Sequence, residues 1–150
     1  MKKLKPYLPA ILWMGVIALL STSSFSGNVT SSLLEDILDL LGIKHGWRFL
    51  DSLDFLVRKT AHVVIYSILA LLWYRCLIRA AGMGRTKAII VSLAISVVWA
   101  ASDEVHQYFV PDRTAKVSDV MLDSAAAAAA LVVIGPMMNV KKKSRQAAAQ

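Results

Sequence analysis

The residues best suited to chemistry lie between Ser102 and Asp119, a polar stretch that follows one apolar run and precedes another. If the first run continues as a helix, Asp103, His106 and Gln107 are spaced i, i+3 and i+4 and share one face. Glu104 points about 100° away from Asp103, toward a flank of that helix. A carboxylate, an imidazole and an amide at the end of an apolar helix need polar partners from elsewhere in the chain.

Suitable partners open the second long apolar run of the sequence. Lys59, His62 and Tyr66 are spaced i, i+3 and i+7, which again places them on one helical face, and Arg58 precedes them. Arg113 follows a turn-like Pro-Asp pair, and no nearby residue gives it a local structural role. We therefore expect Arg113 to reach over the cluster.

These residues form an ordered set of motifs along the chain: Arg58-Lys59-x-x-His62-x-x-x-Tyr66, Asp103-Glu104-x-His106-Gln107, Pro111-x-Arg113 and Asp119, preceded by a weaker group of Trp13, Ser21, Ser23 and Ser24. The set resembles the VanZ-like membrane proteins, a family named for a teicoplanin-resistance accessory protein. The resemblance runs from about Leu12 to Gly135 and departs from the family pattern at Asp123, where asparagine is favoured. It implies a helical cell-envelope membrane protein, and it implies no established biochemical activity.

Composition independently favours a membrane protein. The chain has 150 residues, of which 57% are hydrophobic, and its mean hydropathy is +0.56. That much apolar surface is hard to bury in one small soluble domain, so we disfavour a soluble all-α fold. Four apolar runs predict an all-α, four-helix transmembrane bundle over residues 1–140, followed by a basic tail over 141–150 that we expect to be disordered. The runs are 7–20, 61–78, 88–101 and 120–138.

The charges predict an orientation. Eleven of the 17 basic residues flank the apolar runs on one side: Lys2, Lys3, Lys5, Arg75, Arg79, Arg85, Lys87, Lys141, Lys142, Lys143 and Arg145. The ten acidic residues lie in the other connections or at the helix ends that border them. The positive-inside rule then predicts that both termini are cytoplasmic. The resemblance to the VanZ-like proteins implies that the membrane is the cytoplasmic membrane of a bacterium. The net charge of +7 thus indicates topology rather than nucleic-acid binding.

The first run has an alternative interpretation as a cleaved signal peptide, because it starts with lysines and ends at a serine cluster. We favour a retained helix, since no clear small-x-small cleavage site follows Leu20. Small residues between Ala125 and Ala130 predict a face for close helix packing.

A short amphipathic helix is expected on the outer side between the first two runs. Ser32-x-x-Glu35 is a candidate capping box for its start, and Gly42 can end it. Asp51 or Ser52 then caps the helix that continues into the second span.

Helical spacing places the polar residues at one depth. Lys59 to Arg75 and Asp103 to Lys87 are each about 24 Å along a helix, and Asp123 to Lys141 is about 27 Å. The hydrocarbon core of a membrane is about 30 Å thick. We therefore expect Lys59, Asp103 and Asp123 to lie at or just inside its outer boundary. Ionisable groups at such depth face protein or water and tend to be functional.

Two sets of roles are predicted for the cluster. The candidate catalytic residues are His62, Asp103, Glu104, His106 and Asp119, with a histidine as general acid or base oriented by Asp103 or Asp119. The candidate substrate-binding residues are Arg58, Lys59, Tyr66, Gln107 and Arg113, which suit a phosphate or carboxylate. No cofactor is predicted. A divalent metal held by the histidines and carboxylates is a disfavoured alternative, because Asp-Glu-x-His is not a typical metal spacing.

Several functions remain open at this point. An enzyme acting on anionic headgroups or lipid-linked cell-wall intermediates would use the cluster directly, with membrane lipids as its surroundings. A non-catalytic envelope factor would bind a lipid-linked precursor, an antibiotic or another membrane protein. A purely structural polar network would pin the bundle together. A transport pathway is disfavoured, because only Ser92 and Ser96 offer polar groups deeper in the third run.

Overall fold

The computed structural model describes residues 4–22, 27–110 and 115–138. Within these ranges the fold is all-helical, which confirms the predicted class. The helices are α1 (Leu8–Leu20), α2 (Gly27–Leu40), α3 (Trp47–Arg79), α4 (Arg85–Tyr108) and α5 (Val117–Val133), with short 3-10 turns η1 (Lys5–Tyr7) and η3 (Gly135–Met137). The basic tail over 141–150 lies outside the described residues and stays a prediction.

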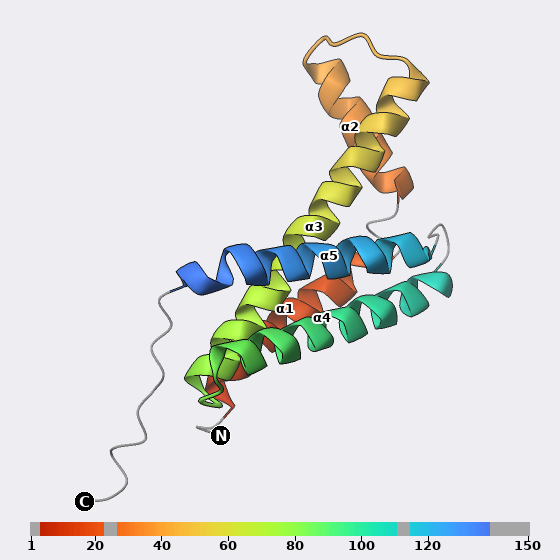
Figure 1. The fold of residues 1–150 in the computed structure, drawn as a ribbon. Helices are drawn as coiled ribbons and strands as arrows, with labels where there is room; N and C mark the ends of the chain where they lie inside the picture. Colours follow the sequence, from red (N-terminus) through yellow and green to blue (C-terminus); the bar gives the residue numbers. More distant parts are fainter. Residues whose placement is uncertain (1–3, 23–26, 111–114, 139–150) are drawn as a thin grey trace, which may run out of the picture.

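The apolar helices pack into one bundle. In Figure 1, α4 and α5 run alongside each other, α3 crosses them, and α1 lies against α3 and α4. One apolar core cluster surrounds Tyr74 and Leu131, and a second surrounds Ile17 and Tyr66. The alanine run of α5 contributes buried methyl groups to the packing, as predicted, through Ala126, Ala127 and Ala130.

Three helices are long and apolar enough to cross a membrane: α3, α4, and α5 together with η3. The first apolar run is helical too, but η1 and α1 together extend only from Lys5 to Leu20 and fall below that length. The described residues therefore support three spans, and the fourth span of the predicted bundle is not confirmed. Helix α1 still belongs to the bundle, because the Trp13 indole donates to the carbonyl of Ile65 on α3 at 2.9 Å.

Helix α2 and the first third of α3 form a hairpin that projects away from α1, α4 and α5 (Figure 1). The predicted capping box at Ser32 is wrong, because α2 already begins at Gly27. The predicted end is correct. Gly42 has φ of +68°, and the amides of Gly42 and Ile43 donate to Asp39 and Leu38. That pattern is a Schellman motif, which favours glycine at its left-handed position.

The start of α3 also differs from the prediction. The helix begins at Trp47 after an extended Gly46, so neither Asp51 nor Ser52 caps it. Both lie inside the first turns, where the Ser52 hydroxyl donates to the carbonyl of Arg48. At 33 residues, α3 is about 50 Å long and exceeds a hydrocarbon core of about 30 Å. Its length therefore lets one continuous helix build both the hairpin and the bundle.

Candidate functional site

Helices α3 and α5 meet through His62 and Asp123. The His62 Nδ1 atom lies 3.2 Å and 3.1 Å from the two carboxylate oxygens of Asp123. An ionised carboxylate only accepts hydrogen bonds, so Nδ1 carries the proton of a neutral His62. No hydrogen bond to Nε2 occurs among the described residues, and that nitrogen keeps its lone pair. The ring of Tyr66, one turn further along α3, stacks on His62 at 6.4 Å.

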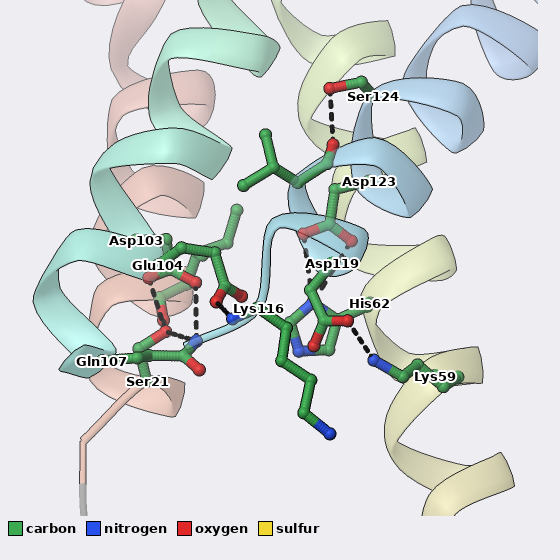
Figure 2. Close-up of polar contacts among 12 residues, drawn as sticks. Ser21, Lys59, His62, Asp103, Glu104, Gln107, Lys116, Asp119, Asp123 and Ser124 are labelled. Carbon is green, nitrogen blue, oxygen red and sulfur yellow. Dashed lines mark hydrogen bonds and ion pairs between the residues drawn. The ribbon is translucent and has the colours of Figure 1, made fainter. Parts of the chain in front are cut away.

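One turn from this pair, the same two helices are joined again. Lys59 Nζ donates to Asp119 Oδ1 in a partly buried ion pair. Lys59 and His62 are spaced i, i+3 on α3, and Asp119 and Asp123 are spaced i, i+4 on α5, so each pair occupies neighbouring turns on one helical face. Two basic groups of α3 thus face two carboxylates of α5 (Figure 2).

The carboxylate of Asp103 connects α4 to α1. It accepts a hydrogen bond of 2.5 Å from the Ser21 hydroxyl and one of 3.1 Å from Gln107 Nε2 (Figure 2). Ser21, Asp103 and Gln107 are all buried. Ser21 lies at the C-terminal end of α1 and Asp103 near the C-terminal end of α4, so these two helix ends meet at this hydrogen-bonded group.

Glu104 is buried beside this group and holds the start of α5. Its Oε2 accepts the backbone N–H of Lys116 at 2.7 Å, and Lys116 is the residue before the first turn of α5. Its Oε1 is buried and has no hydrogen-bond partner among the described residues. The side chain therefore still has a free acceptor inside the bundle.

A small polar pocket of about 50 Å³ opens between these helices. At about 30 Å³ per water molecule, it has room for one or two waters or for a substituent of a few heavy atoms. Basic groups dominate its wall, and its one carboxylate is already paired with a lysine. The lining residues are Phe55, Arg58, Lys59, His62, Gln107, Lys116 and Asp119.

Other predicted site residues lie elsewhere. His106 is exposed and lines a different, largely apolar groove of about 950 Å³ between α1 and α4. The two histidines do not line a common pocket, so the expectation that His62 and His106 share a site is wrong. On α4, Asp103, Glu104 and Gln107 fall within an arc of about 100°, and His106 lies about 60° outside it. Burial of the first three turns the imidazole outward.

Arg58 and Tyr66 have more restricted positions than predicted. Arg58 lines the pocket, but its Nη2 pairs with the buried carboxylate of Asp54 at 2.9 Å, one turn earlier on α3. Tyr66 is fully buried, does not line the pocket, and its hydroxyl makes no hydrogen bond of standard geometry among the described residues. It contacts the site through the ring of His62. Arg113 lies outside the described residues, and its role stays a prediction.

Three residues of the site received no role from the sequence. For Asp123 the sequence predicts a depth in common with Lys59 and Asp103 and shows a departure from the family pattern, but it indicates no chemical role. Its i+4 spacing from Asp119 nevertheless indicates the same face. Ser21 appeared only in a weak motif. Asp54 was missed, and its one signal was the i, i+4 spacing to Arg58. No group of three or more His, Cys, Asp or Glu side chains that could hold a metal ion occurs in the described part of the chain.

The arrangement suits proton transfer next to an anion. A carboxylate that holds Nδ1 of an imidazole fixes its tautomer and leaves Nε2 to accept or donate a proton. Here Asp123 holds His62, and His62 lines a pocket whose other walls carry ammonium and guanidinium groups. Such groups bind phosphate and carboxylate oxygens.

The helices and the polar cluster at their ends define a class, that of small all-helical membrane proteins with ionisable residues gathered at one end of the bundle. Comparison with protein families identifies the family within that class. The model of the VanZ/LLP1 family matches residues 7–138, so the chain belongs to this family. Comparison with curated proteins and with solved structures found no match.

Proposed function

We propose that the pocket at the polar end of the bundle binds an anionic group of a membrane amphiphile, and that His62 acts on it as general acid or base. The observation that carries the proposal is the composition of the pocket wall. It combines the side chains of Arg58, Lys59 and Lys116 with an imidazole held by Asp123. A pocket of about 50 Å³ suits one phosphate or carboxylate rather than a sugar.

The expected depth of the pocket in the membrane indicates the class of substrate. Lys59 lies about 24 Å from Arg75 along α3, so the pocket is at the level of lipid headgroups. An amphiphile can present its charged group there while its chains remain in hydrocarbon. The family resemblance to a teicoplanin-resistance accessory protein makes a lipid-linked cell-wall precursor one member of this class. Under the positive-inside rule the pocket faces outward from a bacterial cytoplasmic membrane, with both termini in the cytoplasm.

A non-catalytic binding role is the second candidate. The observation in its favour is that most carboxylates of the cluster are already occupied. Asp119 pairs with Lys59, and Asp103 is held by Ser21 and Gln107. Among the described residues that line the pocket, His62 has a ring nitrogen left for proton transfer, so its replacement separates the two functions.

The first test is lipid extraction and mass spectrometry of the protein purified in mild detergent. We expect an anionic amphiphile with the wild type and its loss with Lys59→Gln/Asp119→Asn, a double change that avoids an unpaired buried carboxylate. Lys44→Gln is the matched control, because Lys44 is exposed on the hairpin and its replacement also removes one cation. Equal retention by all three proteins, at equal folding, would contradict the anion site.

The second test separates chemistry from binding. The amphiphile identified in this way is incubated with wild type, His62→Gln and His106→Gln, and its conversion is followed by mass spectrometry. We expect His62→Gln to reduce turnover at least about a hundredfold, the usual contribution of a positioned acid or base. His106→Gln should behave as wild type, since His106 lies outside the pocket. Binding without turnover in the wild type would favour the non-catalytic role.

A further inference from the structure

A second depression, with both basic and apolar walls, lies at the C-terminal end of α3, about four turns beyond His62. It is a groove of about 260 Å³ between the start of the chain and the last two turns of α3. Its basic wall consists of Lys5, Arg75 and Arg79, and its apolar wall includes Pro6, Pro9 and Leu72. The three cations therefore come from two segments that are about 70 residues apart in sequence.

Specific contacts hold these two segments together. The Cys76 thiol donates to the carbonyl of Pro6 at 2.9 Å, which fastens η1 to α3. The rings of Tyr7 and Trp73 pack at a centroid distance of 6.2 Å. Because η1 contacts α3 through both Pro6 and Tyr7, the adjacent Lys5 lies beside the arginines of α3. The cation cluster is thus part of the fold and does not depend on the chance position of a free terminus.

The charge of this cluster is not compensated by the described part of the protein. Lys5, Arg75 and Arg79 form no ion pair with an acidic side chain in those residues, whereas Arg58 and Lys59 each have one. Arg75 and Arg79 are at i, i+4, where like charges destabilise a helix. The acidic residues of the sequence lie toward the other end of the bundle. An anion from outside the chain would relieve this repulsion.

We propose that this groove binds the phosphate of an anionic phospholipid headgroup, with one acyl chain along Leu72 and Pro9. Arg75 lies about 24 Å from Lys59 along α3, so the groove is at the level of the other headgroup layer. Basic pockets between membrane helices on the cytoplasmic side suit such headgroups. The apolar wall distinguishes a lipid from free phosphate, which would gain nothing from it. This site is separate from the proposed function and does not depend on it.

Native mass spectrometry of the full chain, stripped of lipid in a neutral detergent, tests the proposal. Phosphatidylglycerol, phosphatidylcholine and inorganic phosphate are titrated separately. We expect saturable binding of phosphatidylglycerol, at least about tenfold weaker binding of phosphatidylcholine, and little binding of inorganic phosphate. Arg75→Gln/Arg79→Gln should weaken phosphatidylglycerol binding roughly thirtyfold, the loss expected for two cations near a membrane surface.

Arg85→Gln/Lys87→Gln is the matched control, because these two exposed cations flank the same end of the bundle but do not line the groove. The control should change binding less than about threefold. Lys5→Gln, an exposed replacement that leaves α3 intact, should weaken binding roughly fivefold and provides the test if the double arginine variant misfolds. Equal losses in the two double variants would mean general surface attraction and would overturn the proposal. Inorganic phosphate that displaces all bound lipid would also overturn it, in favour of a phosphate site.

Discussion

Asp103 is the residue through which the short helix α1 is tied to the C-terminal end of α4. Its carboxylate accepts hydrogen bonds from Ser21 of α1 and from Gln107 of its own helix. A buried carboxylate is costly unless its oxygens are hydrogen-bonded, so these donors are required for the helix ends to meet. A motif that looked catalytic in the sequence therefore has a structural role in the fold.

Replacement of Ser21 tests this role. Ser21→Ala removes the shortest donor to Asp103, and we expect the free energy of unfolding to fall by about 1.5–3 kcal/mol, the range for a hydrogen bond to a charged group. Ser102→Ala is the control, because Ser102 is exposed and donates only to the Val98 carbonyl of its own helix. It should cost less than about 0.5 kcal/mol. Equilibrium unfolding in mixed micelles measures both, and equal costs would show that the contact to Asp103 contributes no stability.

At the scale of the elements, α3 links the two parts of the structure. Its first turns pack with α2 in the hairpin, its middle carries Lys59 and His62, and its last turns carry Arg75 and Arg79. Many apolar side chains of the hairpin are exposed, including Leu33, Ile37, Leu40 and Trp47. The described contacts of α2 are chiefly with α3, so the hairpin should open more readily than the bundle.

Replacement of two glycines by alanine is expected to have opposite effects on stability. Gly42 has φ of +68° and open space around it, so Gly42→Ala adds no clash and only the left-handed backbone penalty of about 1–2 kcal/mol. Gly15 lies inside α1, also with no neighbour within 4 Å of an added Cβ atom, so Gly15→Ala should stabilise that helix by about 0.5–1 kcal/mol. Amide hydrogen exchange should become faster at the end of α2 in the first variant and slower in α1 in the second. Unchanged exchange in α2 would contradict the Schellman motif.

At the scale of the whole molecule, the polar cluster and the basic groove lie about 24 Å apart along α3, at opposite ends of the part of that helix that belongs to the bundle. The positive-inside rule assigns these ends to opposite sides of a membrane. This asymmetry matters for both proposals, because each places an anionic group at a different headgroup layer. The orientation is itself open to a direct experiment.

Labelling of introduced cysteines tests the orientation. In a Cys76→Ser background, whose hydroxyl can still donate to the Pro6 carbonyl, Lys44→Cys lies on the hairpin loop and Arg85→Cys at the start of α4. Both native side chains are exposed. In intact cells, a membrane-impermeant maleimide should label Cys at position 44 and label position 85 only after lysis. The reverse pattern would invert the topology, and with it the assignment of the pocket to the outer side.

The sequence by itself determined the features that depend on local pattern. Apolar runs predicted the helices of the bundle, and Gly42 predicted the end of α2. The common depth of Lys59, Asp103 and Asp123 also comes from helical spacing, and it stays a prediction. The family followed from ordered motifs, and its model matches residues 7–138. These features depend on short-range geometry, with 3.6 residues in each turn, and need no knowledge of neighbouring helices.

The tertiary structure decided which side chains meet. The spacing of α4 fixed the angles between Asp103, Glu104 and His106, but only packing against three other helices set which of them turned inward. That rotation buried Glu104, exposed His106 and left Asp123, rather than Asp103 or Asp119, as the partner of His62. The packing of α1 against α4 and of η1 against α3 also brought Ser21 to Asp103 and Lys5 to Arg75, across more than 60 residues of sequence. Helix rotation is set by the summed packing of several faces, and no single segment of sequence contains that sum.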